Sequence, residues 1–80
     1  MITEKKKRTQ RTQILLLMED GRPRTMLQIA RETHIERATI CRRIAELRTA
    51  GKVYKAFTSK DHLTDELAGY YTIYPQFFIN

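Results

Sequence analysis

The spacing of hydrophobic residues along this 80-residue chain changes once, close to Gly51. Before Gly51, apolar residues recur three and four positions apart, as they do on the buried side of amphipathic helices. After it, β-branched and aromatic residues alternate with polar ones, which is typical of strands. The pattern predicts an α+β domain in which a three-helix core is followed by a two- or three-stranded antiparallel sheet.

The first predicted helix lies in the N-terminal quarter of the chain. It begins near Thr9, and its buried side is the apolar cluster within residues 14–18. It ends before Gly21, which suits the left-handed conformation that commonly follows a helix. Residues 22–24 contain Pro23, which lacks a backbone donor and restricts the residue before it. We therefore expect an extended connector there, with room for one short strand.

The second and third helices are separated by a short turn. The second follows Thr25, because Thr25-x-x-Gln28 forms a capping box, and it ends near Thr33. The turn is at residues 34–35, and the third helix covers residues 36–50. At 100° per residue, one side of the third helix is apolar and is predicted to be buried; it consists of Ile40, Ile44 and Leu47. The residues predicted to face outward are Ala38, Cys41, Arg42, Ala45 and Thr49, with Arg37 and Arg48 on one flank and Arg43 on the other.

Two strands are predicted after Gly51, one from Val53 and one over residues 70–74. The polar segment 58–69 joins them as the loop of an antiparallel hairpin. On the second strand we expect one alternating set of side chains to point inward and the other to be partly exposed, although the opposite register also fits. The expected inward residues are Tyr71 and Ile73, and the expected exposed residues are Tyr70 and Tyr74.

One segment, residues 25–53, contains a specific set of spacings. It holds Ile29-Ala30, Ile35 at the turn, Thr39-Ile40, Arg42-Arg43-Ile44, Leu47 and Gly51-Lys52-Val53. This set resembles the pattern of winged helix-turn-helix repressors, in which an Ile-Ala pair precedes a Thr-Val/Ile-x-Arg-x-Leu recognition helix and a Gly-x-Val strand start. The resemblance covers residues 9–75, and it implies a transcriptional regulator whose residues 36–48 enter the major groove of double-stranded DNA. Where the family usually has glycine at the turn, this chain has His34.

The charge of the chain is unevenly distributed. The net charge is +6, with fourteen basic and six acidic residues in residues 1–57 (+8) and one basic and three acidic residues in residues 58–80 (−2). Basic charge concentrated on one part of a small domain is typical of proteins that bind a polyanion, so we predict double-stranded DNA as the partner. The alternative is general solubility, since many small basic domains bind no nucleic acid.

The predicted DNA contacts on the third helix are Arg37, Ala38, Thr39, Cys41, Arg42 and Arg43. Arginine can pair bidentately with guanine, and small side chains allow close approach to thymine methyl groups. In the alternative interpretation, this side of the helix is solvated and Arg42 pairs with Glu46 four residues later. Arg43 would then bond an acidic neighbour, and the small residues would form a protein-binding face.

Further predicted contacts lie outside the third helix. Residues 1–8 lack hydrophobic periodicity and are predicted to be a flexible basic arm before a single domain, residues 9–80. The arm residues expected to contact phosphates are Lys5, Lys6, Lys7 and Arg8, although a solubilising tail is the alternative. In the hairpin loop the predicted contacts are Lys60 and His62. The acidic residues Asp61, Asp65 and Glu66 oppose this prediction, because they would repel a phosphate backbone.

Enzymatic, metal and membrane functions are not expected. His34 and Cys41 lack the spacing of a zinc site, and the sequence has no glycine-rich phosphate loop, catalytic carboxylate pair or Ser-His-Asp set. We therefore predict no metal, cofactor, small-molecule ligand or catalysis. The longest apolar run, residues 14–18, is much shorter than the roughly 20 residues of a membrane span. The single cysteine and the absence of a signal-type segment predict a cytoplasmic protein.

Two rival functions use the same fold. One is a protein-protein adaptor that does not bind DNA, and the other is a DNA-binding module for replication or plasmid maintenance. The oligomeric state is also open. The apolar tail, residues 75–80, either covers the first helix or joins a homodimer interface, and the first helix is a second candidate for that interface. A dimer would read two half-sites and so increase the contact energy.

Overall fold

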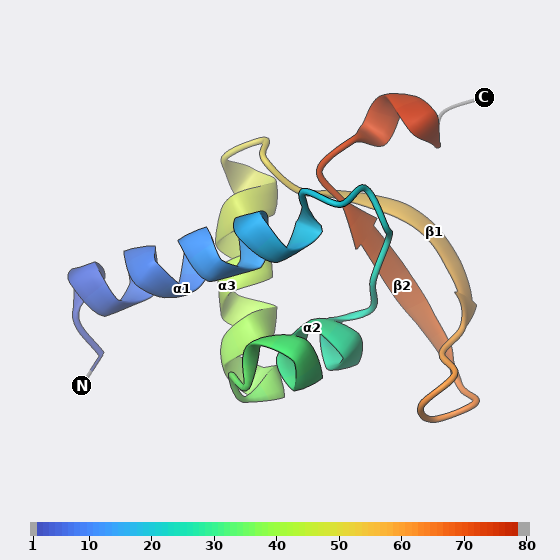
Figure 1. Ribbon diagram of the computed structural model, residues 1–80, viewed down its shortest axis with the longest axis horizontal. Coiled ribbons are helices and arrows are strands. Elements are labelled where there is room, and N and C mark those ends of the chain that lie inside the picture. Colours follow the sequence, from blue (N-terminus) through green and yellow to red (C-terminus); the bar gives the residue numbers. More distant parts are fainter. Residues whose placement is uncertain (1, 79–80) are drawn as a thin grey trace.

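The computed structural model describes residues 2–78 of the chain. Three helices are followed by two antiparallel strands, and the prediction of an α+β domain with this order of elements is confirmed. Figure 1 shows the helices crossing one another, with the hairpin projecting on the side away from the N-terminus. The elements are α1 (Glu4–Met18), α2 (Met26–Thr33), α3 (Arg37–Thr49), β1 (Tyr54–Lys60), β2 (Leu67–Thr72) and a 3-10 turn, η1 (Pro75–Phe77).

Helix α1 begins at Glu4, so the prediction of a flexible arm over residues 1–8 is wrong from Glu4 onward. The Thr3 hydroxyl accepts a hydrogen bond from the backbone N–H of Lys6 at 3.2 Å and caps the helix. Glu4 lies in the first turn, where a negative charge is favourable, and it pairs with Arg11 at 2.6 Å. Capping and charge therefore extend this helix into a segment without hydrophobic periodicity.

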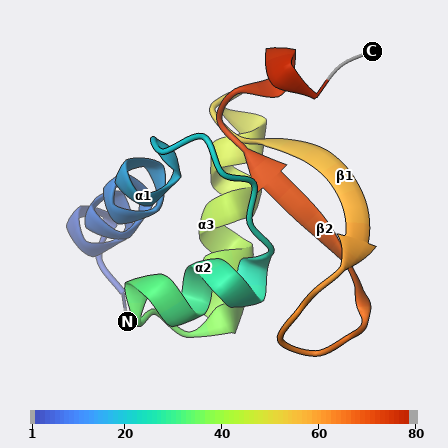
Figure 2. The same cartoon turned by 45° about the vertical axis from the view of Figure 1, so that its right-hand side comes forward.

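The three helices enclose one core (Figure 2). The predicted capping box is present at the start of α2: the Thr25 hydroxyl accepts from the Gln28 backbone N–H at 3.1 Å, and the Gln28 side chain accepts from the Thr25 N–H at 3.2 Å. After α2, His34 adopts a left-handed φ of 60°, which makes the predicted turn. The buried apolar residues of the core are Ile14, Met18, Ile29, Ala30, Ile40, Ile44, Leu47, Val53 and Tyr71.

The loop of the hairpin is shorter than predicted. The strands pair as far as Lys60 and Leu67, so residues 61–66 connect them rather than the whole of 58–69. The pairing register shifts at Ala56, which inserts one extra residue into β1 and increases its twist. Residues 58–60 and 67–69, on either side of the loop, therefore belong to the strands.

Tyr70 and Tyr71 are both buried, which corrects the expectation that Tyr70 is partly exposed. They point to opposite faces of the hairpin, and Tyr71 joins the core. Tyr70 stacks on Phe57 with ring centroids 4.7 Å apart, and Phe57 also contacts Phe78 at 6.0 Å. The Tyr70 hydroxyl donates a hydrogen bond to the Lys60 carbonyl at 2.8 Å. A second aromatic cluster on the outer face of the hairpin thus explains the burial of Tyr70.

The tail packs on this chain at two places. The Tyr74 hydroxyl donates to the Glu19 carbonyl at the end of α1, at 3.2 Å, and its ring lies 5.9 Å from that of Phe77. Phe78 contacts the hairpin rather than α1. Residues 79–80 lie outside the described residues, and dimerisation stays a prediction.

The connector between α1 and α2 joins the hairpin to the helices. Arg24 and Tyr71 form an antiparallel bridge, in which the Arg24 N–H donates to the Tyr71 carbonyl at 3.1 Å and the Tyr71 N–H donates back at 2.8 Å. The predicted extended connector is therefore present, and its short strand is this bridge. The buried Arg24 guanidinium also binds the carboxylates of Asp20, at 2.7 Å, and Glu32. The end of α1, helix α2 and strand β2 are thereby tied to one residue.

Replacing Ile44 by alanine should lower the free energy of unfolding by about 2–5 kcal/mol, because its fully buried side chain would leave a cavity between the helices. Leu16→Ala is the matched control: Leu16 lies on α1 with 59% of its surface exposed, and its loss should change stability by no more than about 0.5 kcal/mol. Urea denaturation measures both. An Ile44→Ala protein that unfolds at the parental urea concentration would contradict the core assignment.

Candidate nucleic-acid interface

Helix α3 turns one long side toward solvent. Its opposite side is buried through Ile40, Ile44 and Leu47, as predicted. Of the predicted contacts on α3, Thr39 is half-buried, and those that are exposed are Arg37, Ala38, Cys41 and Arg42. Two of these four side chains are small, so a close-fitting partner can approach the helix backbone between the two arginines.

Arg37 and Arg42 are not neutralised within the part of the chain that the structure describes, where no carboxylate lies within 4.0 Å of either guanidinium. The alternative pairing of Arg42 with Glu46 is absent. Glu46 instead binds Arg11 at 2.7 Å and Arg43 at 3.1 Å, on the side of α3 that faces α1. The two exposed arginines therefore keep their donors for an external acceptor.

The prediction that Arg43 contacts DNA is wrong, because only 3% of the surface of this residue is exposed. Its guanidinium lies between α1 and α3, where it binds the Glu46 carboxylate and donates to the Gln10 side chain at 3.3 Å. Its Nε is buried and has no hydrogen-bond partner among residues 2–78. The alternative of an acidic neighbour is confirmed for this residue, which holds two helices together.

The basic residues at the start of α1 are on a helix, and one of them lies beside the start of α3. Lys5, Lys6 and Arg8 are exposed and Lys7 is half-buried, all on a helix rather than on a flexible arm. Lys6 lines a shallow groove together with Thr39 at the start of α3. The same groove is also lined by Glu36, so Lys6 is the basic residue of α1 that lies next to the start of α3.

The hairpin supplies exposed basic residues on the other side. Lys60 and His62 are exposed, as predicted. Lys60 lies 3.9 Å from Asp65, and both side chains are largely in solvent, where such a pair contributes little. Lys55 is an exposed residue that the sequence analysis missed, and it pairs directly with Tyr71 across the hairpin. Residues paired directly across a hairpin point to the same face. The pairing of β1 with β2 could therefore have placed Lys55 on the same face as Tyr71.

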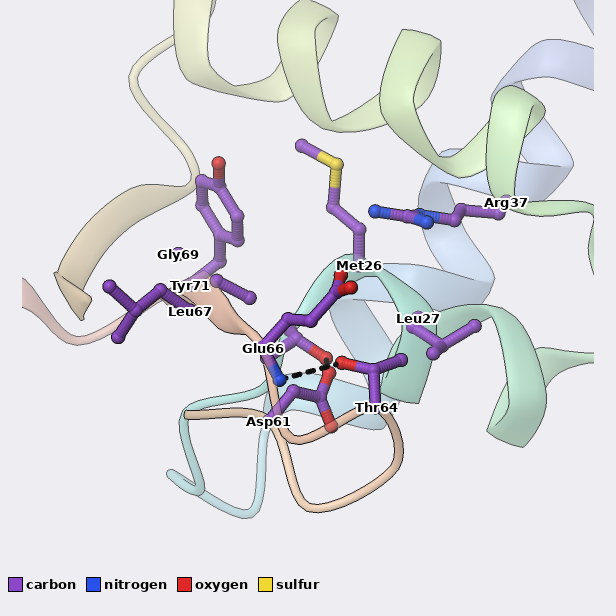
Figure 3. A pocket seen from close by; sticks show the side chains of 11 residues that line it. Met26, Leu27, Arg37, Asp61, Thr64, Glu66, Leu67, Gly69 and Tyr71 are labelled. Atoms are coloured by element: carbon purple, nitrogen blue, oxygen red, sulfur yellow. Dashed lines mark hydrogen bonds between the residues drawn. The ribbon is translucent and has the colours of Figure 1, made fainter. Parts of the chain in front are cut away.

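A hollow of about 170 Å³ separates the start of α3 from the hairpin loop. Figure 3 shows Arg37 entering it from α3, Met26 from α2 and Glu66 from the loop. Arg37 and Glu66 line the same hollow but are not an ion pair. The hollow therefore carries both signs of charge, and Arg37 remains available at its edge.

Asp61 is buried, with 2% of its surface exposed, and is not the exposed acidic residue that was predicted. Its carboxylate accepts hydrogen bonds from the Thr25 hydroxyl, from the Gln28 amide at 3.3 Å and from the Leu63 N–H at 2.9 Å. Burial raises the pKa of Asp61, but these hydrogen bonds outweigh burial and the net pKa is lowered, with a smaller contribution from His62. The ionised carboxylate fastens the loop to the start of α2.

Comparisons with protein-family models, curated proteins and solved structures found no match. Among the helices of residues 2–78, none is long and apolar enough to cross a membrane. Within the same residues, no three His, Cys, Asp or Glu side chains are grouped so that they would hold a metal ion. The chemistry of the candidate site therefore has to be argued from its own side chains.

Replacing Asp61 by alanine should destabilise the protein by about 1.5–3 kcal/mol at neutral pH, since Thr25 and Gln28 would lose a charged acceptor. The folded pKa lies below the unfolded value, so this contribution is complete above about pH 4 and is lost as the pH falls through the folded pKa. Urea denaturation of the parent and the variant should therefore give stabilities that converge in acid.

The control for this experiment is Asp65→Asn, which removes a charge from the same loop where the side chain is 87% exposed. Asparagine tolerates the left-handed φ of 60° at this position, so stability should stay almost unchanged. A stability difference between the parent and Asp61→Ala that is as large at about pH 2 as at neutral pH would count against the charged hydrogen bonds.

Proposed function

We propose that the protein binds double-stranded DNA by inserting α3 into the major groove, in a winged helix-turn-helix arrangement. The observation that carries the proposal is the exposed side of α3, where Arg37 and Arg42 flank small residues and are not neutralised by a described carboxylate. The major groove is about 12 Å wide and admits a helix of about 10–12 Å diameter. Free guanidinium groups on such a helix can pair with guanine edges.

The order of the elements supports this proposal. Helix α2 is followed by a tight turn at His34 and then by α3, and the hairpin of β1 and β2 is anchored beside them through Arg24 and Asp61. In a helix-turn-helix unit the second helix reads the groove while the first crosses the DNA backbone. The layout of three helices followed by a two-stranded hairpin is compatible with such a unit.

The proposed contacts divide by their chemistry. Base edges would be read from α3, through Arg37, Ala38, Thr39, Cys41 and Arg42. Backbone phosphates would be bound from α1 and from the hairpin loop, where the basic side chains are Lys5, Lys6, Lys7, Arg8, Lys60 and His62. Phosphate contacts orient a protein on the duplex, whereas base contacts give sequence preference. The role that best fits sequence-specific binding by so small a domain is transcriptional regulation; replication or plasmid maintenance would use the same surface.

One observation favours a second candidate, a protein-protein adaptor. Two leucines of the hairpin are exposed, Leu63 at 42% and Leu67 at 74% of their surface. Apolar side chains in that position suit a protein partner better than a phosphate backbone. The free arginines of α3 and the basic start of α1 do not suit that candidate, and salt dependence separates the two.

Titration of the protein against a random-sequence duplex tests the proposed function. Binding to DNA should weaken steeply as salt is raised from about 50 to 200 mM, because bound cations release counterions from the duplex. Fluorescence anisotropy of a labelled duplex measures this. A protein that shows no affinity at the lowest salt concentration, or an affinity independent of salt, would exclude DNA binding and leave the adaptor.

Arg42→Ala should weaken binding to a preferred sequence by about 1–3 kcal/mol while leaving the fold intact, because Arg42 is exposed and makes no described ion pair. A preferred sequence is first obtained by selection from a random pool. The matched control is Arg31→Ala, which removes the same charge from an exposed position on α2. Equal losses for the two variants would remove Arg42 from the base-reading set.

A further inference from the structure

A second basic site lies next to the exposed side of α3, where the C-terminal half of that helix meets the hairpin. The Arg48 guanidinium lies over the ring of Tyr71, 5.6 Å from its centroid. Tyr71 is a core residue of β2, so its ring is held by packing, and Figure 3 shows its hydroxyl directed toward α3. Arg48 therefore rests on a fixed surface rather than projecting freely into solvent.

Lys55 approaches the same tyrosine from the neighbouring strand. Lys55 and Tyr71 are paired across the hairpin, and both reach over Gly69. A β-carbon on Gly69 would come within 3.1 Å of Lys55 Cε and within 3.3 Å of the Tyr71 hydroxyl. The absence of a side chain at Gly69 thus gives Cε of Lys55 and the hydroxyl of Tyr71 room to lie on the same side of the hairpin.

The three donors of this site are available to a ligand. Within residues 2–78, neither Arg48 nor Lys55 forms an ion pair, and both are exposed. The Tyr71 hydroxyl makes no hydrogen bond within the same residues, and 9% of the surface of Tyr71 is exposed. Two cations therefore lie near one tyrosine, whose own hydroxyl is the third donor. A phosphodiester fits such a set, since each of its two non-bridging oxygens can accept more than one hydrogen bond.

We infer that Arg48, Lys55 and Tyr71 form a seat for one backbone phosphate of the duplex, at the base of the hairpin rather than at its loop. The inference rests on the proposed function, because the phosphate belongs to the DNA whose major groove α3 occupies. The seat would act on affinity and orientation and not on sequence preference, since a phosphate is the same at every base pair.

The test compares Lys55→Ala with Lys52→Ala, a matched pair with the same charge change three residues apart. Lys52 is also exposed but lines a different groove, beside Leu15 and Tyr54. Loss of one phosphate contact lowers the magnitude of the slope of log affinity against log salt by about 0.9. Lys55→Ala should show that change with a random duplex, and Lys52→Ala should keep the parental slope.

Tyr71→Phe provides a second, uncharged readout. It keeps the ring in the core and the surface under Arg48, so its melting temperature should match the parent. Loss of the hydroxyl donor should weaken duplex binding roughly 2- to 10-fold at fixed salt and leave the salt slope unchanged. This result would distinguish a hydrogen bond to the ligand from a general effect of charge.

The outcomes separate the seat from the proposed function. If the unmodified protein fails to bind the duplex at about 50 mM salt, the proposed function and the seat are both wrong. If it binds with the expected salt dependence but Lys55→Ala equals Lys52→Ala, or Tyr71→Phe binds as the parent does, the seat alone is wrong. The seat is supported if Lys55→Ala changes the salt slope while Lys52→Ala does not, and if Tyr71→Phe weakens binding without changing the slope.

Discussion

Two adjacent residues, Arg24 and Thr25, hold the hairpin to the helices, and the rest of the structure depends on them. The backbone of Arg24 pairs with Tyr71 of β2, and its side chain binds Asp20 at the end of α1 and Glu32 on α2. These contacts raise the pKa of Arg24, chiefly through the hydrogen bond with Asp20, and lower that of Asp20. Thr25 caps α2 and also donates to Asp61 of the hairpin loop. A two-stranded hairpin has little stability of its own, so this junction fixes its position relative to α3.

The chain carries many cations and still forms a compact core. Its arginines divide into a group that holds elements together and a group that is left free. The arginines that hold elements together each contact carboxylates within the fold and are Arg11, Arg24 and Arg43. The exposed arginines of α3 have no such partner among the described residues. Arg8 on α1 and Arg31 on α2 are exposed and also have none within residues 2–78, so the positive charge available to a ligand includes α3 but is not confined to it.

Features set by local patterns were predictable from the sequence. The buried side of α3, the Thr25 capping box and the turn at His34 each depend on residues within one or two helical turns. The start of α1 was missed because its signal is a cap and an acidic first turn, not hydrophobic spacing. The burial of Arg43 was also missed. At its border position on the helix, only the location of α1, and with it Gln10, decides whether the side chain is covered.

The other wrong predictions concern residues whose partners lie far away in the sequence. From the sequence, Asp61 is expected to be a solvated loop residue. Its burial depends on Thr25, thirty-six positions earlier. Tyr70 was expected to be partly exposed because strand alternation gives the hairpin one inner face. The outer face is covered here by Phe57 and by a tail residue, Phe78. Alternation identifies which residues share a face but not whether a later segment covers it.

The burial of Asp61 changes the electrostatic objection to DNA binding by the hairpin. Of the three acidic residues that the sequence places there, Asp61 is enclosed and satisfied by donors of its own chain, and Asp65 lies within 3.9 Å of Lys60. That exposed pair contributes little, so Asp65 and Glu66 both remain, and Glu66 lines the hollow toward Arg37. The base of the hairpin carries Lys55 and adjoins Arg48 through Tyr71. Repulsion of a phosphate backbone would thus come from Asp65 and Glu66 of the loop, and in solvent it decays within about 8–10 Å. The proposed interface accordingly combines α3 with the base of the hairpin and gives the loop the smaller part.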